Sequence, residues 1–319
     1  DAVRQQIGII GDHSTIRHAL ETGGMLAPSQ SPILILGETG TGKELFARFI
    51  HRLSGRSHEA FIPVNCAALP EALVESILFG HKRGAFTGAV TDQIGKFDTA
   101  HKGTLFLDEM GELPLPTQAK LLRVIQDGLL EPIGHTKPHK VDVRIVAATN
   151  RDLRKLVRQG KFREDLYYRL NVGEVRLPPL RERRSDIPKL ALHILDRLNG
   201  SLRRPKRLSP GALSRIQSHN WPGNVRDLEN VIERSVLLCR RDVLDADDLL
   251  IYEPVTYADP LDALPDPYEG FSLDEFLGSA RKQMILKALD AASGNQSRAA
   301  RLLGITPQAV HKFLQLSKV

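Results

Sequence analysis

The octapeptide GETGTGKE at residues 37–44 follows directly on the apolar run ILIL at residues 33–36. A buried strand that ends in a glycine-rich turn and opens a helix is the context in which the pattern G-x-x-x-x-G-K binds phosphate. The glycines allow a tight turn, so that successive N–H groups and the helix N-terminus point at one anion. The competing interpretation is a glycine-rich turn that binds nothing. The sequence therefore predicts a phosphate-binding loop formed by Gly37, Glu38, Thr39, Gly40, Thr41, Gly42, Lys43 and Glu44.

Acidic residues for a metal ion come from two places in the chain. Glu44 stands where the general pattern has a Ser or Thr that touches Mg²⁺, so other groups must hold part of the metal. The apolar stretch TLFLDE at residues 104–109 ends in two adjacent carboxylates. Asp108 is predicted to hold Mg²⁺ through water and Glu109 to polarise an attacking water, with Glu44 as a further metal candidate. A solvated acidic turn after a core strand is the alternative.

Composition sets the class of protein. The chain has 319 residues, 41% hydrophobic and 26% charged, which is typical of a globular protein with about two domains. No membrane-length apolar run and no signal-peptide pattern occur, so we expect a cytoplasmic protein without a membrane partner. Cys66 and Cys239 are too few and too far apart for a metal site, and ordinary reduced thiols are expected. The net charge of +6 favours a polyanionic partner, although ATP or solvated faces also explain it.

Hydrophobic patterns divide the chain into four parts. Over residues 1–180, short apolar runs alternate with amphipathic stretches, which predicts an α/β domain with a doubly wound, mostly parallel sheet. Strands are expected at residues 33–36, 61–64, 104–107 and 143–147. Residues 181–251 keep helical patterns and lose strand patterns. Residues 252–270, rich in Pro and Asp, indicate a linker, and residues 271–319 an all-α domain in which the stretch 272–319 carries seven basic and three acidic side chains.

Several motifs together resemble bacterial enhancer-binding proteins, the AAA+ ATPases that activate sigma-54 RNA polymerase. The resemblance covers about residues 8–250, and GAFTGA is its most specific motif. It implies an AAA+ P-loop NTPase with a helical lid, and it adds ATP and Mg²⁺ as cofactors. The motifs occur in the family's order: GETGTGKE, VNCAAL at 64–69, ESILFGHKRGAFTGA at 75–89, GTLFLDE at 103–109, VRIVAATN at 143–150, FREDLYYRLN at 162–171, LPPLRERRSDI at 177–187 and WPGNVRDLEN at 221–230.

The same resemblance implies roles for polar residues around the nucleotide. Asn65 resembles the switch residue that hydrogen-bonds the catalytic carboxylate, a task that suits an amide. Asn150 resembles the sensor of the γ-phosphate or its water. Arg226 resembles the second sensor, which couples ATP to the position of the lid. Ile10 and Gly11 resemble the segment that contacts adenine. For any one of these polar residues taken alone, a hydrogen bond in the core or a position on the surface is the commoner role.

Two arginines resemble the family's arginine fingers, which reach the site of the neighbouring subunit in a hexameric ring. A guanidinium at the γ-phosphate offsets the charge of the transition state. An ideal helix turns by about 600° over six residues, so Arg163 and Arg169 are expected about 120° apart and in different roles. Surface ion pairs with Glu164 and Asp165 are the alternative for either arginine.

The GAFTGA loop contains no catalytic group. Its glycines make a mobile tip that can expose an aromatic side chain. The resemblance implies that Phe86 and Thr87 contact sigma-54 when ATP extends the loop, whereas the alternative is that Phe86 folds back into the core. The family usually has ESELFG, so Ile77 is a departure, and a second insertion at residues 131–140 is expected to flank the loop. The predicted sigma-54-contacting residues are Gly84, Ala85, Phe86, Thr87, Gly88 and Ala89.

The tail at residues 295–315 has the pattern of two helices joined by a tight turn at Gly304. Apolar spacing predicts inward-facing side chains at Ala299, Ala300, Leu302, Leu303, Val310, Phe313 and Leu314. The pattern resembles the Fis-type helix-turn-helix domain, with residues 273–291 as a dimer contact and paired DNA half-sites as the target. A helical hairpin without DNA is the alternative. The candidate DNA-binding residues are Thr306, Gln308, Ala309, His311, Lys312 and Gln315.

These features favour a ring-forming ATPase that remodels the sigma-54 closed promoter complex while its tail holds an enhancer. Two other classes compete with this hypothesis. A general AAA+ unfoldase or loader would act on other proteins, and GAFTGA argues against it. A DNA-binding regulator that uses ATP only as a ligand is disfavoured by the acidic pair and the two arginines. The printed sequence starts at or near the ATPase region, so it defines neither the input signal nor the target genes.

Overall fold

The computed structural model describes residues 2–86, 88–135, 137–251, 271–292 and 294–316. The chain divides into two compact units, Asp1–Tyr252 and Glu253–Val319. The predicted linker at residues 252–270 and Thr87 of the GAFTGA loop lie outside the described residues. Within the described part, no helix is both long and apolar enough to cross a membrane.

A five-stranded parallel sheet forms the centre of the larger unit, with the strand order β2-β3-β6-β1-β7. Four of its strands match the predicted apolar runs, with ends shifted by one or two residues at most. The fifth, β7, was not predicted because its four residues alternate between buried and exposed and make no continuous apolar run. The strands are β1 Ile33–Leu36, β2 Phe61–Asn65, β3 Thr104–Asp108, β6 Arg144–Thr149 and β7 Gly173–Arg176.

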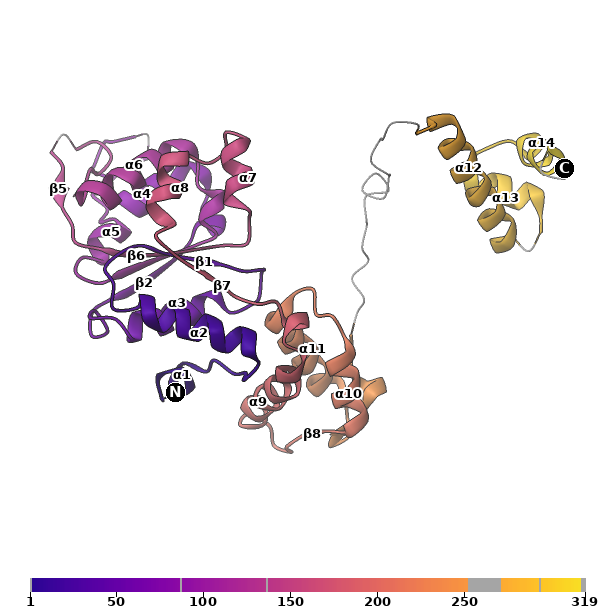
Figure 1. Ribbon diagram of the computed structural model, residues 1–319, viewed down its shortest axis with the longest axis horizontal. Helices are drawn as coiled ribbons and strands as arrows, with labels where there is room; N and C mark the ends of the chain where they lie inside the picture. The colour runs from indigo at the N-terminus through magenta and orange to yellow at the C-terminus, as the bar shows by residue number, and fades with distance from the viewer. Residues whose placement is uncertain (1, 87, 136, 252–270, 293, 317–319) are drawn as a thin grey trace. The chain divides into compact units, whose positions relative to one another are not determined.

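Helices cover both faces of this sheet, which confirms the doubly wound α/β fold (Figure 1). One face packs against α2 Ser14–Leu26 through Ile16 and Leu20 and against α3 Lys43–Arg52 through Phe46 and Ile50. The other packs against α4 Glu71–Phe79, α6 Leu115–Asp127, α7 Leu153–Arg158 and α8 Glu164–Leu170. Shorter elements are α1 Ala2–Ile7, α5 Lys96–Thr99, the antiparallel pair β4 Leu129–Leu130 and β5 His139–Lys140, and the 3₁₀ turns η1 Cys66–Ala68 and η2 Met110–Glu112.

The helical part of the larger unit has a hydrophobic core of its own, centred on the fully buried Trp221. Its indole N–H donates to the carbonyl of Ile216 at 2.8 Å. The prediction that residues 181–251 lack strands is wrong, because the two-residue segments β8 Arg207–Leu208 and β9 Val243–Leu244 pair in parallel. The helices are α9 Ile187–Asn199, α10 Pro210–Ser218 and α11 Asn224–Leu238, with 3₁₀ turns η3 Leu180–Glu182, η4 Arg184–Asp186 and η5 Ala246–Asp248.

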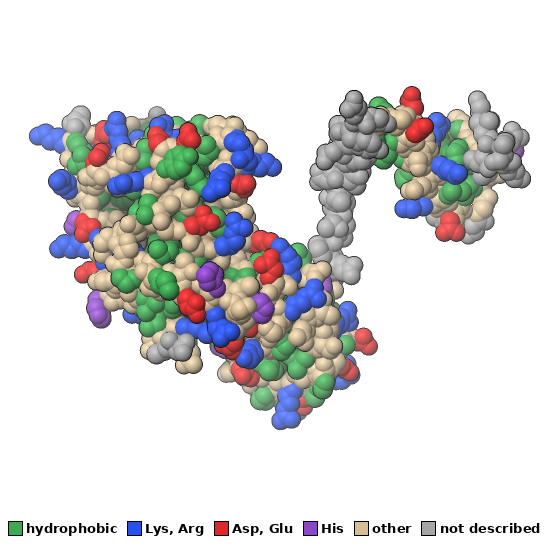
Figure 2. Space-filling model, in the orientation of Figure 1, with side chains coloured by type: hydrophobic (Ala, Val, Ile, Leu, Met, Phe, Trp, Pro, Cys, Tyr) green, Lys and Arg blue, Asp and Glu red, His purple; other side chains and the backbone are tan. Residues whose placement is uncertain are grey.

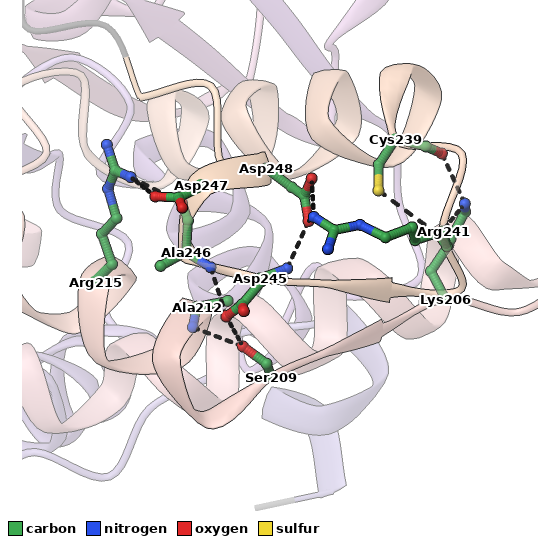
Figure 3. A network of polar contacts seen from close by, with 10 residues as sticks. All are labelled: Lys206, Ser209, Ala212, Arg215, Cys239, Arg241, Asp245, Ala246, Asp247 and Asp248. Atoms are coloured by element: carbon green, nitrogen blue, oxygen red, sulfur yellow. Dashed lines mark hydrogen bonds and ion pairs between the residues drawn. The ribbon is translucent and has the colours of Figure 1, made fainter.

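Polar contacts around η5 hold the strand pair β8–β9 in place (Figure 3). Arg241 binds both carboxylate oxygens of Asp248, at 2.7 and 2.6 Å. Asp245 accepts from the hydroxyl of Ser209 at 2.6 Å. The ammonium group of Lys206 donates to two backbone carbonyls, at 2.8 and 2.5 Å. Two residues per strand are too short for an apolar pattern, so sequence patterns alone could not reveal this pair.

The smaller unit is a three-helix domain made of α12 Leu273–Ala291, α13 Gln296–Leu303 and α14 Pro307–Leu316. Gly304 ends α13 in the left-handed conformation at φ 64°, as the predicted turn requires. Its core contains Ile285, Ala300 and Val310. The prediction that Leu302 packs inward is wrong: its side chain is exposed, and Ile305 takes part in the core instead. The side chain of Leu314 lies outside the described part.

We predict that Gly103→Ala destabilises the larger unit, because a Cβ at position 103 would lie 2.2 Å from the carbonyl oxygen of Ala60. Overpacking against backbone typically costs about 1–3 kcal/mol. The matched control is Gly55→Ala, where an added Cβ meets nothing within 4 Å. Urea unfolding followed by circular dichroism should show a lower midpoint for the first variant only. Equal midpoints for both variants would contradict the backbone contact.

Candidate functional site

The predicted phosphate-binding loop lies between the end of β1 and the start of α3, at the carboxyl edge of the sheet. Gly40 and Gly42 have φ angles of 78° and 99°, a region that favours glycine. The amide of Gly37 donates to the carbonyl of Thr149 at 3.2 Å, which ties the loop to β6. Because α3 begins at Lys43, its first-turn N–H groups have no acceptor within the helix and suit an anion.

Lys43 is held inside this loop although it is charged. Its side chain is only 5% exposed, and its ammonium group lies 3.1 Å from the carbonyl oxygen of Gly37. It also forms an ion pair with Glu109 at 3.2 Å. The positive charge is therefore placed at the mouth of the loop, facing the acidic pair that ends β3.

The two carboxylates after β3 have different environments. Glu109 has a φ angle of 52°, which is uncommon for a residue with a side chain and marks local strain. Its second carboxylate oxygen accepts from the backbone N–H of Asn150 at 3.2 Å. Asp108 is half-buried, and this burial raises the pKa of its carboxyl group, while the charge of Lys43 opposes the shift. The pair therefore supplies one fixed carboxylate beside Lys43 and one that is partly desolvated.

The two predicted asparagines lie at the carboxyl ends of β2 and β6, the strands on either side of β3. Asn65 stands opposite Asp108 in the register of β2 and β3. Its amide oxygen accepts from the backbone N–H of Ala67 at 3.0 Å. The structure shows Glu109 bound to other groups, and the switch role of Asn65 stays a prediction. The Asn150 amide donates to the hydroxyl of Thr39 in the loop at 3.0 Å, so this asparagine does touch the phosphate-binding loop.

The acidic residues fit a magnesium ion only in part. Glu44 pairs with Arg48 one helical turn away, at 2.8 Å, and its side chain is half exposed. Among the described residues, no three His, Cys, Asp or Glu side chains come together as a metal site. Mg²⁺ usually needs only one or two carboxylates besides water and nucleotide phosphates, and Asp108 is placed to supply one. The donor set therefore fits Mg²⁺ bound together with a nucleotide.

The start of α11 touches the phosphate-binding loop, a contact that sequence patterns did not reveal. The backbone N–H of Val225 donates to the carbonyl of Gly40 at 3.0 Å. The side chain of Asn224 is fully buried and donates to the carbonyl of Thr39 at 3.0 Å. A Cβ on Gly40 would lie 3.2 Å from the Cβ of Arg226, the predicted second sensor, which is itself exposed.

Asp186 holds the predicted adenine-contacting segment to the lid and was also missed. Its buried carboxylate accepts from the backbone N–H groups of Asp12 at 2.7 Å and His13 at 3.0 Å. Gly11 precedes these two residues, and a Cβ there would lie 2.5 Å from the carboxylate. Ile10 packs partly against the lid core. Ile10 and Gly11 therefore lie against the lid, and the same lid contacts the phosphate-binding loop.

A cavity of about 800 Å³ opens beside the first two residues of the loop. Neither Lys43 nor Asp108 lines it, so it flanks the predicted phosphate position without containing it. Its lining includes Gly37, Glu38, Asn150, Arg176, Pro179 and Arg181. A volume of this size is typical of small-molecule sites.

The two predicted fingers differ in their surroundings. Arg163 is the N-cap residue of α8 and lies outside the helix, so the expected separation of 120° on one helix does not apply. It forms an exposed ion pair with Asp165 at 2.7 Å, as the surface alternative proposed. The side chain of Arg169, in the last turn of α8, is exposed and has no hydrogen bond or ion pair among the described residues. Both positions are accessible to a neighbouring molecule.

The GAFTGA loop projects from the end of α4. Phe86 is 39% exposed, and its ring meets the edge of the buried His81 ring at a centroid distance of 5.0 Å. Gly84 and Gly88 have positive φ angles, and the N–H of Gly84 donates to the carbonyl of Ala89 at 2.9 Å. The aromatic side chain is therefore neither buried in the core nor fully extended.

The second insertion flanks this loop, as expected. The N–H of Lys82 donates to the carbonyl of Ile133 at 3.0 Å. A Cβ on Gly134 would lie 2.6 Å from the Cβ of Ala85. The two insertions form one projection of the α/β domain.

In the smaller unit, Thr306, Gln308 and His311 are exposed and Ala309 is partly buried. The N–H of Ala309 lies 3.3 Å from the hydroxyl of Thr306, which caps α14. The side chains of Lys312 and Gln315 lie outside the described part. On the face drawn in Figure 2, Lys and Arg are interspersed with Asp and Glu, so the net charge does not itself mark a binding surface.

Burial explains why Cys66 carries no chemistry at this site. It is 3% exposed, and desolvation together with the charges of Asp108 and Glu109 raises the pKa of its thiol to about 12. A thiol with so high a pKa is not a nucleophile at neutral pH.

The parallel sheet, the loop after β1, the acidic pair after β3 and the helical lid define a P-loop nucleotide-binding domain of the AAA+ type. The chain belongs to the family of sigma-54-dependent transcriptional activators, because the model of the sigma-54 interaction domain matches residues 9–176. The model of the AAA+ ATPase lid domain matches residues 181–252, and that of the Fis family of bacterial regulatory proteins matches residues 281–313.

Curated relatives agree with this assignment. The chain is 47% identical over 307 residues to the Nif-specific regulatory protein of Azotobacter vinelandii, covering 96% of this chain and 58% of that protein. It is 48% identical over 293 residues to the regulatory protein AtoC of Escherichia coli strain K12, covering 91% and 63%. The chain thus spans about three fifths of the length of these relatives. A crystal structure of NtrX from Brucella abortus in complex with ADP is 34% identical, with a TM-score of 0.72, and the match covers 99% of this chain and 71% of that one.

We predict that Asp108→Asn stabilises the protein at neutral pH. Burial raises the pKa of Asp108 above 3.8, so the folded state binds a proton more tightly than the unfolded state does. The ionised carboxylate therefore lowers the free energy of unfolding above the folded pKa, and this cost disappears as the pH falls towards 3.8. Urea unfolding at pH 7 and pH 4 should show a gain for the variant that shrinks at the lower pH. A variant that is less stable than wild type at pH 7 would contradict the assigned shift.

Proposed function

We propose that this chain is a mechanochemical ATPase that activates sigma-54 RNA polymerase while bound to enhancer DNA. The observation that carries the proposal is the placement of Lys43 in a glycine-rich loop, 3.2 Å from the Glu109 carboxylate, within the family's fold. The ion pair brings a cation suited to phosphates and a carboxylate suited to orienting water into direct contact beside the loop. This supports hydrolysis rather than nucleotide binding alone.

The residues divide the chemistry among them. Loop N–H groups and the Lys43 ammonium bind the β- and γ-phosphates of ATP, and Asp108 would hold Mg²⁺ through water. When bound there, Mg²⁺ would supply positive charge that offsets the charge of the phosphates. Glu109, positioned by Lys43 and the N–H of Asn150, orients the attacking water and accepts its hydrogen bond. Asn150 and Asn65 then report the state of the γ-phosphate. Arg226, Ile10 and Gly11 complete the proposed site on the side of the lid.

Arg169 is the better placed of the two fingers to act on a neighbouring subunit. Arg163 is occupied by Asp165, whereas Arg169 has no partner among the described residues. A finger supplied in trans is typically worth about 10³–10⁵ in rate. The proposed active form is therefore a ring, assembled from dimers into a hexamer.

We predict that subunits with Arg169→Ala and subunits with Glu109→Gln are each nearly inactive as ATPases, and that a mixture of the two regains turnover. In the mixture, a Glu109→Gln subunit supplies its Arg169 to the intact acidic pair of an Arg169→Ala neighbour. The matched control is Arg158→Ala, an exposed arginine in the last turn of α7, which should stay active alone. Phosphate release measures all four samples. A mixture no more active than its parts would exclude catalysis in trans.

The GAFTGA loop is the proposed output. Phe86 is partly exposed, and a Cβ added at Gly84 or Gly88 would meet nothing within 4 Å, so extension of the loop meets little steric resistance. The proposed extended form presents Phe86 and Thr87 to sigma-54. The energy of hydrolysis then acts on the closed promoter complex through this contact.

We predict that the protein held with ADP and aluminium fluoride forms a stable complex with purified sigma-54, and that Thr87→Ala loses the complex while keeping ATP hydrolysis. The matched control is Thr22→Ala, on the exposed side of α2, which should bind as wild type does. Gel filtration measures the complex. If wild type hydrolyses ATP yet binds no sigma-54, an unfoldase or loader becomes the better proposal. If the wild-type protein neither binds sigma-54 nor hydrolyses ATP, a nucleotide-gated DNA binder becomes the better proposal.

The smaller unit is the proposed enhancer-binding domain. Thr306, Gln308 and His311 are exposed at and beyond the start of α14, where a recognition helix meets base edges. Ala309, Lys312 and Gln315 complete the proposed surface. Leu273 and Leu277 are exposed on α12 and favour the predicted dimer contact, which would present two such helices to paired half-sites.

A further inference from the structure

We propose that Asn224 is a positioning residue that couples the phosphate-binding loop to η3, the turn between β7 and the lid helices, which we call the hinge of the lid. The proposal rests on the nucleotide-binding function proposed above and concerns how a nucleotide moves the lid. It assigns the hydrogen-bonded link to Asn224, two residues before the predicted second sensor Arg226. Arg226 is exposed, whereas Asn224 is fully buried between loop and hinge.

The amide of Asn224 makes three hydrogen bonds to two distant parts of the chain. Its oxygen accepts from the backbone N–H of Leu180, at the start of η3, at 2.7 Å. Its nitrogen donates to the carbonyl of Thr39 at 3.0 Å and to the carboxylate of Glu38 at 3.2 Å. One side chain therefore bridges the hinge and the phosphate loop from the first residue of α11.

A second contact, between Arg181 and Glu38, joins the same two parts of the chain that Asn224 bridges. Arg181 follows Leu180 and binds both carboxylate oxygens of Glu38, at 2.8 and 2.6 Å. The Glu38 carboxylate thus holds the hinge through Arg181 and the lid through Asn224. The hydrogen bonds from the Arg181 guanidinium, and to a smaller extent the one from the Asn224 amide, hold the pKa of the Glu38 carboxyl below its usual range, against the opposing effect of burial. A shift of Glu38 or Thr39 on nucleotide binding must pull on the hinge and on α11 together.

The identity of residue 224 follows from two requirements. Its φ angle is 55°, a left-handed conformation that Asn and Asp tolerate better than other residues with a side chain. The bonds require one acceptor, for Leu180, and two donors, for Thr39 and Glu38. A neutral side chain that carries an acceptor and two N–H donors is an amide, whereas a hydroxyl has only one donor. Asn224→Asp keeps the size, the backbone preference and the acceptor. It removes the donor and places a negative charge against the Glu38 carboxylate.

The test uses Trp221, the single tryptophan of the chain, as a built-in probe of the lid. Trp221 is fully buried in the lid core, and its carbonyl accepts from the N–H of Asn224 at 2.8 Å. Saturating ADP should change the fluorescence of wild type. In Asn224→Asp, equilibrium dialysis should still detect ADP binding while the fluorescence change is lost.

Rescue separates coupling from a purely structural role. In the double variant Asn224→Asp with Glu38→Gln, the new amide can donate to the new carboxylate, which restores one hydrogen bond with its direction reversed. Part of the fluorescence change should return, although the bond to Thr39 stays lost. The matched control Asn220→Asp changes an exposed lid amide that accepts from Arg184 at 2.6 Å, a bond that a carboxylate can also make. It should behave as wild type.

A full ADP response in Asn224→Asp would overturn the proposal. The proposal would also be overturned if the loss of the fluorescence change merely followed a lower melting temperature of Asn224→Asp and the double variant did not regain it. If Asn224→Asp does not fold, Asn224→Gly keeps the backbone conformation, removes the side chain, and is expected to bind ADP without the fluorescence change. The fluorescence assay needs only ADP binding, so it tests the coupling even if the wild-type protein does not hydrolyse ATP. A wild-type protein that binds ADP but does not hydrolyse ATP would refute the proposed ATPase and not the coupling.

Discussion

The contact between the phosphate-binding loop and the lid is the constraint on which the rest of the site depends. The N–H of Val225 donates to the carbonyl of Gly40, and a Cβ on Gly40 would lie 2.2 Å from the carbonyl of Gly223. Glycine at position 40 is therefore required by the lid as well as by the turn of the loop. Because one residue serves both, the geometry that binds phosphate and the geometry that places the lid cannot change independently.

Backbone strain is concentrated where these parts meet. Glu109, Trp221 and Asn224 all have positive φ angles, which residues with side chains seldom adopt. Each is held by surrounding contacts: Glu109 by Lys43 and Asn150, and the other two by burial in the lid core and against the loop. Such strain persists only when its surroundings determine it, so the lid, the acidic pair and the loop stabilise one another's conformations.

Local sequence patterns predicted most of the fold, but they could not predict contacts between segments that lie far apart in the sequence. The strands β1, β2, β3 and β6 were predicted because buried parallel strands are continuous apolar runs, and β7 was missed because one of its faces is exposed. The phosphate loop and the acidic pair were found by their spacing. Asn224 and Asp186 were not singled out, because their partners lie 185 and 174 residues away and no local pattern shows such a contact.

The most direct test of the account is hydrogen–deuterium exchange of the whole chain with and without ADP and aluminium fluoride. Nucleotide should change exchange both at residues 222–228, where the Val225 amide is bound to Gly40, and at residues 84–94, which carry the GAFTGA loop. Such a result would show that the phosphate-binding loop, the lid and the projection that carries GAFTGA all respond to the bound nucleotide. Unchanged exchange in both regions, with nucleotide shown to be bound, would contradict the central claim.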